Sequence, residues 1–410
     1  MNQTVLLIGT FDTKGMEYAF VRDRLHSLGL RTLHANIGVM GDSDAIRSDI
    51  TAEEIAAEAG AALPELRAKG DRGFAMQSMG RGMAKLARRL YEEGRFSAVF
   101  GMGGTGGSSV VGEAMRALPF GVPKVLVSTV ASGDTRPIVG TRDITLIPSV
   151  VDVAGINSIS RIVLTRAAGA VAGMINAGAS KEAADKPIVG ITMFGNTTKC
   201  VDRCRQQLTE KGYEVLVFHC TGTGGRTMEE LVKDGLISAV LDITTTEWAD
   251  EIAGGVFAAG PNRLSAPGEV GIPHLIVPGC VDMVNFGPKE TVPARYADRQ
   301  FHVWNANVTL MRTNVEENRR MGEIFAETAN RAIGPRAFLL PLKGVSILDS
   351  EGGEFWQPEA NQALYDALRQ QLAPGIRVAE ADLNINDPAF ADKAVSMFLE
   401  LIAEKERTNR

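Results

Sequence analysis

The sequence predicts an α/β protein made of two Rossmann-like domains, each on a mostly parallel sheet, with a ligand cleft between them. Continuous apolar runs such as Val5–Ile8 and Val125–Val127 are typical of strands buried on both faces. Helix-length amphipathic segments alternate with these runs, which indicates parallel strands joined by right-handed crossovers. The same rhythm starts again in the second half. At 410 residues the chain is long enough for two or three domains.

Each half provides its own set of expected elements. In the first half we expect strands at Thr4–Gly9, Arg31–Ile37, Ser97–Gly101, Val125–Thr129 and Ile144–Pro148, and helices at Met16–Leu28, Gly82–Glu93, Gly107–Ala117 and Ser158–Asn176. In the second half we expect strands at Ile188–Thr192, Tyr213–His219, Ser238–Asp242, His274–Val277, Arg336–Leu340 and Ile376–Glu380, and helices at Cys200–Lys211, Arg226–Asp234, Thr313–Ile333, Ala360–Gln371 and Pro388–Glu406. Small and charged residues at Gly178–Pro187 predict the linker.

The two halves also align as copies. A shift of 183 residues pairs Phe11 with Phe194, Arg22 with Arg205, Leu25 with Leu208, Gly29 with Gly212 and Leu33 with Leu216. Further along, Ser97–Val99 pairs with Ser238–Val240 at a shift of 141, so about 42 residues are inserted in the first half, around 39–80. We therefore predict one domain at 1–182 and a second at 183–410.

Composition excludes several classes of protein. With 43 Lys and Arg against 49 Asp and Glu, the formal charge is −6, which argues against a nucleic-acid footprint or a polybasic membrane surface. The small apolar stretch Ala167–Ala179 is too short to span a bilayer, and the amino terminus lacks the basic region of a signal peptide. The four cysteines lack zinc-ligand spacing and are interpreted as reduced thiols. We therefore expect a cytoplasmic protein without nucleic-acid or membrane partners.

The first candidate site follows the first strand, where Gly9–Gly15 leads into a helix. Ligands of open α/β sheets bind beyond the carboxyl ends of strands, and a helix N-terminus favours an anion. Lys14 offers a charge for phosphate, Thr13 a hydroxyl group and Asp12 a ligand for magnesium. The alternative is that Asp12 only caps the helix and Lys14 is solvated.

The second candidate site is the glycine-rich loop Gly101–Gly107. Gly101, Gly103 and Gly106 satisfy the G-x-G-x-x-G spacing between a strand and a helix, which is typical of phosphate binding. No acidic residue ends the following strand to hold a ribose, which argues against NAD, and no G-K-[ST] closes a P-loop. The alternative is a tight turn that lets helix and strand pack closely. The candidate contacts in this loop are Gly103, Gly104, Thr105, Gly106 and Gly107.

The second half places different chemistry after its strands. Glu247, Asp282 and Lys343, together with His219, are candidates for acid–base catalysis on a small anionic substrate. Asn196 lies in the loop that corresponds to the one containing Lys14. The alternative is capping and turn chemistry, which these residue types serve in many proteins.

Several long strings resemble one family. They are Gly9–Lys14, Gly101–Ser108, Pro123–Gly133, Pro148–Asp152, Gly190–Thr198, Asp242–Glu247, Asp282–Pro288 and Lys343–Ser346. Through them the chain resembles, nearly end to end, the family of the ATP-binding amino-terminal domain of the plant tomato mosaic virus resistance protein, which includes many uncharacterised bacterial relatives.

The resemblance implies two Rossmann-like subdomains, a homodimer, and ATP with magnesium in the first subdomain. The implied contacts are Asp12, Thr13, Lys14, Val39, Arg81 and Gly103–Gly107, with Asp12 at the metal. Asn36 departs from the family, whose members tend to have Asp there, which leaves the ribose contact open. The larger plant form carries a barrel domain that a separate partner protein would supply here.

Three hypotheses follow for the function. The first is a Mg-nucleotide-binding protein that holds ATP with the Asp12–Lys14 turn and the glycine loop. The second is a metabolic enzyme, an ATP-dependent or an acyl- or phosphate-dependent transferase or hydrolase, acting on a small anionic substrate in the interdomain cleft. The third is a regulatory module gated by its ligand. Whether the protein is an enzyme is left open.

Overall fold

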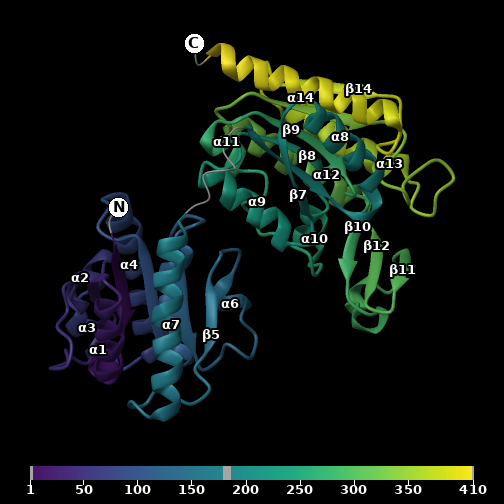
Figure 1. The fold of residues 1–410 in the computed structure, drawn as a ribbon. Helices are drawn as coiled ribbons and strands as arrows, with labels where there is room; N and C mark the ends of the chain where they lie inside the picture. Colours follow the sequence, from purple (N-terminus) through teal and green to yellow (C-terminus); the bar gives the residue numbers. More distant parts are fainter. Residues whose placement is uncertain (1–2, 179–185, 409–410) are drawn as a thin grey trace. The chain divides into compact units, whose positions relative to one another are not determined.

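The chain forms two compact α/β units, Met1–Lys181 and Glu182–Arg410, referred to below as unit 1 and unit 2. The computed structural model describes residues 3–178 and 186–408 (Figure 1). Most of the linker expected at Gly178–Pro187 lies outside the described residues.

Unit 1 is built on a five-stranded parallel sheet in the order β2-β1-β3-β4-β5. Its strands are β1 Thr4–Gly9, β2 Arg31–Asn36, β3 Ala98–Gly103, β4 Lys124–Ser128 and β5 Thr145–Pro148, all within two residues of the bounds expected from sequence. Its helices are α1 Phe11–Ser27, α2 Ala52–Glu58, α3 Leu63–Ala68, α4 Arg72–Glu92, α5 Thr105–Arg116, α6 Arg136–Val139 and α7 Ser158–Ala177. The chain reverses direction across the sheet between β1 and β3, which makes this the switch point of a doubly wound fold.

Helices cover both faces of this sheet (Figure 1). Leu6 and Ile8 pack with α2, α4 and α5, whereas Val5 and Leu7 pack with α1 and α7. Because side chains alternate along a strand, two buried faces require apolar residues at every position. The continuous apolar runs of the sequence follow from this arrangement, and the predicted α/β fold class is confirmed.

Helix α7 is longer than the apolar stretch considered from sequence. By length and composition this 20-residue helix could cross a membrane, and one third of its most apolar window is buried inside the protein. Its residues Leu164, Ala167 and Val171 pack in the core beneath the sheet.

Tyr18 joins the two central strands where they separate. The pairing of β1 with β3 ends at Ile8 and Gly101. Beyond that pair, the Tyr18 hydroxyl donates to the carbonyl oxygen of Ile8 at 2.6 Å and accepts from the amide of Met102 at 2.7 Å. Gly9 is required here, because a Cβ at this position would lie 2.0 Å from the tyrosine ring.

Replacing Tyr18 with phenylalanine is expected to destabilise unit 1 by about 1–3 kcal/mol, because it leaves a buried amide and a buried carbonyl group without partners. Urea unfolding followed by circular dichroism measures this change. Tyr91→Phe is the control, since that ring packs on Phe96 at the other end of the fold. Equal midpoints for the two variants would contradict the role of the Tyr18 hydroxyl.

The insertion contains more helix than the sequence indicates. The expected helix at Gly82–Glu93 begins ten residues earlier, at Arg72, where Asp71 caps it by accepting from the amide of Phe74. The first part of this helix is hard to predict from the sequence, because Gly80 and Gly82 lie inside it and interior glycines weaken helical propensity. Packing requires glycine at position 82, where a Cβ would lie 1.9 Å from the carbonyl oxygen of Ile55 in α2.

Unit 2 repeats the design with six parallel strands in the order β14-β13-β9-β8-β6-β7. The strands are β6 Ile188–Met193, β7 Glu214–His219, β8 Ala239–Thr244, β9 His274–Gly279, β13 Arg336–Pro341 and β14 Arg377–Ala381. The main helices are α8 Thr198–Glu210, α9 Thr223–Lys233, α10 Glu247–Ala253, α11 Ala266–Val270, α12 Val315–Arg331, α13 Pro358–Gln371 and α14 Pro388–Thr408. Read from β7, the strands follow the order seen in unit 1 with one strand added, as the predicted repeat requires.

A small antiparallel sheet in unit 2 was not expected from sequence. Its strands β10 Met283–Phe286, β12 Val308–Arg312 and β11 Phe301–Asn305 form a separate layer at one end of unit 2 (Figure 1). These strands are short, and β11 is largely exposed. They therefore lack the apolar runs that mark the main sheet.

Candidate functional site

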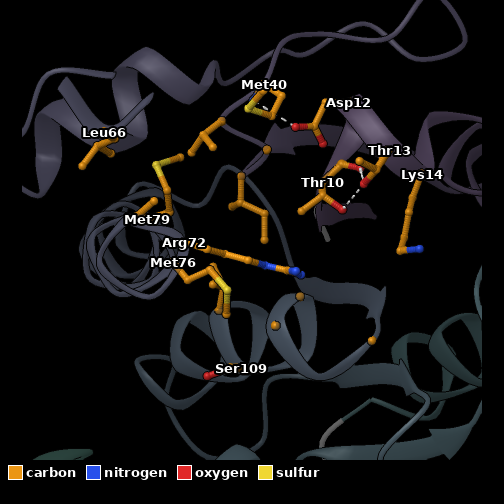
Figure 2. Close-up of a pocket in the computed structure, with 18 of the residues that line it drawn as sticks. Thr10, Asp12, Thr13, Lys14, Met40, Leu66, Arg72, Met76, Met79 and Ser109 are labelled. Atoms are coloured by element: carbon orange, nitrogen blue, oxygen red, sulfur yellow. Dashed lines mark hydrogen bonds between the residues drawn. The ribbon is translucent and has the colours of Figure 1, made fainter. Parts of the chain in front are cut away.

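A pocket of about 1070 Å³ lies at the carboxyl edge of the unit 1 sheet, at its switch point. The loops after β1, β2 and β3 form one side, and α3 and the start of α4 form the other (Figure 2). The volume is at the upper end of the range of small-molecule sites, about 300–1,000 Å³. Two segments predicted from sequence, the Asp12–Lys14 turn and the glycine loop, both line this pocket.

The first loop presents a carboxylate with one unpartnered oxygen. Helix α1 begins directly after Thr10, whose hydroxyl accepts from that of Thr13 at 3.0 Å. Asp12 does not cap α1; its Oδ2 accepts instead from the amide of Met40 at 3.0 Å. Asp12 Oδ1 is buried and has no hydrogen-bond partner among the described residues. A buried polar atom in this state calls for a missing partner such as water or an ion.

Lys14 links the first loop to the last loop of unit 1. Its backbone departs from helical geometry, with φ −131° and ψ 23°. Its ammonium group donates to the carbonyl oxygen of Val153, next to the pocket residue Asp152. Neither residue of the β5–α7 loop was among the predicted contacts, although Asp152 lies in one of the strings that carry the resemblance.

The glycine loop leaves a helix N-terminus open to the pocket. Helix α5 begins at Thr105, and its N-cap residue, Gly104, supplies no side-chain cap. The first amides of a helix have no intrahelical partner, so those of Thr105, Gly106 and Gly107 are available to an anion. A Cβ on Gly104 would meet only Thr129 Oγ1, at 3.7 Å, so the space beside this glycine is open. Gly103 is the buried end of β3 and does not line the pocket.

The insertion supplies a cation, though not the expected one. Arg72, at the start of α4, reaches toward the glycine loop, and a Cβ on Gly106 would lie 3.6 Å from its Nη2 (Figure 2). Arg81, expected at the phosphate, is exposed further along α4 and is not among the pocket residues. Only the earlier start of α4 brings Arg72 to the site. The Asp71 cap, followed by a helical pattern, was the available signal.

The outer wall of the pocket is apolar. Leu66 from α3 and Met76 and Met79 from α4 form this wall (Figure 2). Ile37 and Val39, which follow β2, line the same pocket. Apolar walls with a few polar groups at one end are typical of small-molecule sites. The predicted contact at Val39 is therefore a pocket residue, and its carbonyl oxygen accepts from the guanidinium group of Arg67.

Asn36 has a structural role. It is buried, and its Oδ1 accepts from the amides of Phe11 and Gly38 at 3.0 and 2.9 Å. Its Nδ2 donates to Gly41 O and to Asp42 Oδ1, both at 2.9 Å. An aspartate could not make the last two bonds. Asn36 therefore fixes the β2 loop against α1 and does not line the pocket.

The three catalytic candidates of unit 2 have different surroundings. Glu247 is buried against Arg263, with Nε 2.6 Å from Oε2, and accepts from two amides of the β7–α9 turn. Asp282 is buried and accepts from the Ser346 hydroxyl at 2.8 Å. Lys343 is half exposed and pairs with Asp382 at 3.1 Å. The contacts of Glu247 are those of a structural ion pair.

Known families match both units. A model described as the N-terminal domain of an uncharacterised protein family, UPF0261, matches residues 3–180, and its C-terminal counterpart matches residues 186–402. The chain belongs to the UPF0261 family. A UPF0261 protein of Clostridium tetani is 47% identical over 99% of this chain and 100% of its own length, and one of Mesorhizobium japonicum is 44% identical over 97% and 98%.

The family resemblance seen in the sequence is confirmed. The tomato (Solanum lycopersicum) ToMV resistance protein Tm-1(GCR237) is 45% identical to this UPF0261 chain over 337 residues, which is 80% of the chain and 45% of the tomato protein. Among solved structures, the UDP-GlcNAc 2-epimerase of Methanocaldococcus jannaschii matches with a TM-score of 0.22 at 9% identity, over 97% of this chain and 92% of that one. A score this low carries no functional information.

Proposed function

We propose that unit 1 of this protein binds ATP with magnesium in the pocket at its switch point. The observation that carries the proposal is the open N-terminus of α5 beside two cationic side chains. Gly104 leaves the first α5 amides uncapped, while Lys14 and Arg72 line the same pocket. Amides at a helix N-terminus and flanking cations are the groups that bind a polyphosphate.

The magnesium ion fits the environment of Asp12. Its Oδ1 is buried without a partner, and a carboxylate oxygen is a preferred ligand of this ion. Magnesium usually takes one or two protein carboxylates, with phosphate oxygens and water completing its shell. One carboxylate oxygen does not complete such a shell, so the ion would bind together with the nucleotide.

The apolar wall supports a ligand with a flat, apolar part. Leu66, Met76 and Met79 line the side of the pocket opposite the β1 loop (Figure 2). Methionine side chains adapt to aromatic surfaces and contact them favourably. A nucleobase on this wall would leave its phosphates at the glycine loop. The tomato relative extends well beyond the matched region, so its activity as a whole protein is not carried over.

Isothermal titration of the full chain with ATP and MgCl₂ tests the proposal, with NAD and coenzyme A as competing ligands. Selective, saturable heat with ATP is the expected result. Lys14→Met and Arg72→Met are each expected to weaken binding by about 10- to 100-fold, the value of a charge-assisted hydrogen bond. Arg81→Met is the matched control on α4 and is expected to bind normally. No heat with ATP, or equal weakening in the control, would overturn the proposal.

A further inference from the structure

One buried carboxylate of unit 2 differs from all the others. The described part of unit 2 buries six carboxylate side chains, namely Glu229, Asp242, Glu247, Asp250, Asp282 and Asp349. In five of them, both oxygens accept hydrogen bonds from amides, hydroxyl groups or arginine. Asp282 is the exception, because its Oδ2 accepts from Ser346 while its Oδ1 has no partner. Leaving a charged oxygen in this state is costly, which points to a missing partner.

The position of Asp282 matches that of the unit 1 site. It lies just after β9, at the carboxyl edge of a central strand, where ligands of α/β sheets bind. Within residues 3–178 and 186–408, only Asp12 and Asp282 have a buried carboxylate oxygen without a partner. Each unit therefore contains one such oxygen, and both lie at the same edge of their sheets.

Two further unpartnered acceptors lie in loops that contact one another and the loop of Asp282. Asn196 is the third residue after β6, as Asp12 is after β1, and its Oδ1 is buried without a partner. Its Nδ2 contacts the sulfur of Met283, next to Asp282, at 3.5 Å. The Nδ2 of Asn386 donates to the backbone oxygen of Asn196 at 3.0 Å. The Oδ1 of Asn386 is the third buried oxygen without a hydrogen-bond partner. Three loops of the same edge thus contribute oxygen acceptors.

The local charges do not balance. Arg312 is the buried cation of this region, and its guanidinium contacts Asp349 at 3.3 Å. Toward Asp282, this guanidinium reaches only the backbone oxygen, at 3.4 Å, and not the carboxylate. Of the two buried carboxylates, only that of Asp349 is therefore paired with the guanidinium. Burial, and next the Asp349 carboxylate, raise the pKa of Asp282 to about 7, as expected for an acid that lacks a counter-charge.

We propose that unit 2 binds a small monovalent cationic group at the oxygens of Asp282, Asn196 and Asn386. The three unpartnered oxygens of this site are all acceptors, so the ligand must supply a positive charge or donors. Transition metals are disfavoured, because no cluster of three or more His, Cys, Asp or Glu side chains occurs among the described residues. Because Arg312 pairs with Asp349, the site has one uncompensated negative charge, which a monovalent cation balances. One carboxylate with amide oxygens then suits potassium, sodium, ammonium or a primary amine.

Thermal unfolding of the full chain, without nucleotide or magnesium, tests this site. The three tryptophans, Trp248, Trp304 and Trp356, all lie in unit 2, so their fluorescence reports on this unit alone. The probes are KCl, NaCl, NH₄Cl and methylammonium chloride, with choline chloride holding the ionic strength constant. We expect at least one probe to raise the midpoint saturably, by about 5 °C at a hundredfold excess over its Kd. Response to potassium or sodium indicates an inorganic ion, and response to methylammonium indicates an amine.

Variants make the test specific. Asp282→Asn keeps the size of the side chain but removes its charge, and is expected to abolish the cation-dependent shift. Asn196→Ala removes one acceptor and should weaken the apparent affinity several-fold, which gives a second test if the first variant folds poorly. Asp382→Asn alters an exposed carboxylate after β14 and should respond like the natural protein. No shift with any probe, or an undiminished shift in Asp282→Asn, would overturn the proposal.

Discussion

Replacing Gly104 with aspartate is expected to abolish nucleotide binding by unit 1 while leaving the free protein at least as stable. Gly104 is the N-cap of α5 and has an extended backbone, with φ −77° and ψ −168°, which any residue can adopt. Aspartate is among the best N-cap residues, because its carboxylate accepts from the second or third amide of the helix. These amides are the proposed phosphate donors. The variant would therefore cap the helix with its own side chain.

The expected loss of affinity is about 100-fold or more. A carboxylate about 4 Å from a phosphate repels it by about 4 kcal/mol at the effective dielectric constant of a protein surface. The same carboxylate also removes donors that the ligand needs. The helix in turn gains about 0.5–1 kcal/mol from the cap and from the favourable interaction with its dipole. Loss of function and gain of stability would thus come from one side chain.

Gly104→Ala is the matched control for this variant. Its Cβ has room, with Thr129 Oγ1 the nearest atom at 3.7 Å, and it neither caps the helix nor adds charge. We expect it to bind ATP within a few-fold of the natural protein. Titration calorimetry measures the affinity of each variant, and urea unfolding measures its stability. Full binding by Gly104→Asp would exclude the α5 N-terminus as the phosphate site.

Replacing Arg263 with methionine is expected to unfold unit 2 or destabilise it by about 3–5 kcal/mol. The buried guanidinium pairs with Asp242 through two bonds of 2.7 Å and with Glu247 at 2.6 Å, and a third carboxylate, Glu229, lies 3.4 Å away. Burial acts to raise the pKa of Asp242, but the Arg263 guanidinium holds this pKa well below its usual range. Without it, three buried carboxylates lose their cation.

Tryptophan fluorescence during urea unfolding measures this effect, because all three tryptophans belong to unit 2. Arg205→Met is the control, since Arg205 is half exposed and pairs loosely with Asp202 at 3.9 Å. Surface pairs of this kind contribute at most about 1 kcal/mol. A loss below that value in Arg263→Met would show that the buried network does not hold unit 2 together.

The sequence predicts the frame of both units because their strands are buried on two faces. The runs at Val5–Ile8 and Ile188–Ile191 contain no polar side chain, and their loops carry the glycines and hydroxyl residues typical of ligand edges. Asp12 and Lys14 could be placed at the pocket because the end of a strand fixes their location. These features depend on local pattern and topology alone.

Features set by tertiary contacts could not be predicted. Arg72 reaches the pocket only because α4 starts early and packs against the glycine loop. Glu247 follows a central strand, as a catalytic residue would, but its partner Arg263 is sixteen residues away and its burial depends on the folded core. The strands β10, β11 and β12 have only four or five residues each, so their periodicity is too weak to detect.

The insertion has a consequence for which parts of the pocket can vary independently. One strand order occurs in both units, and the loops after β1 and β3 belong to this repeated part. Leu66, Met76 and Met79, by contrast, come from helices that interrupt the repeat in unit 1. Mutations in this added wall leave the sheet and the glycine loop untouched. In unit 1 the apolar wall of the pocket can therefore change in sequence without altering the loops after β1 and β3 that form its other side.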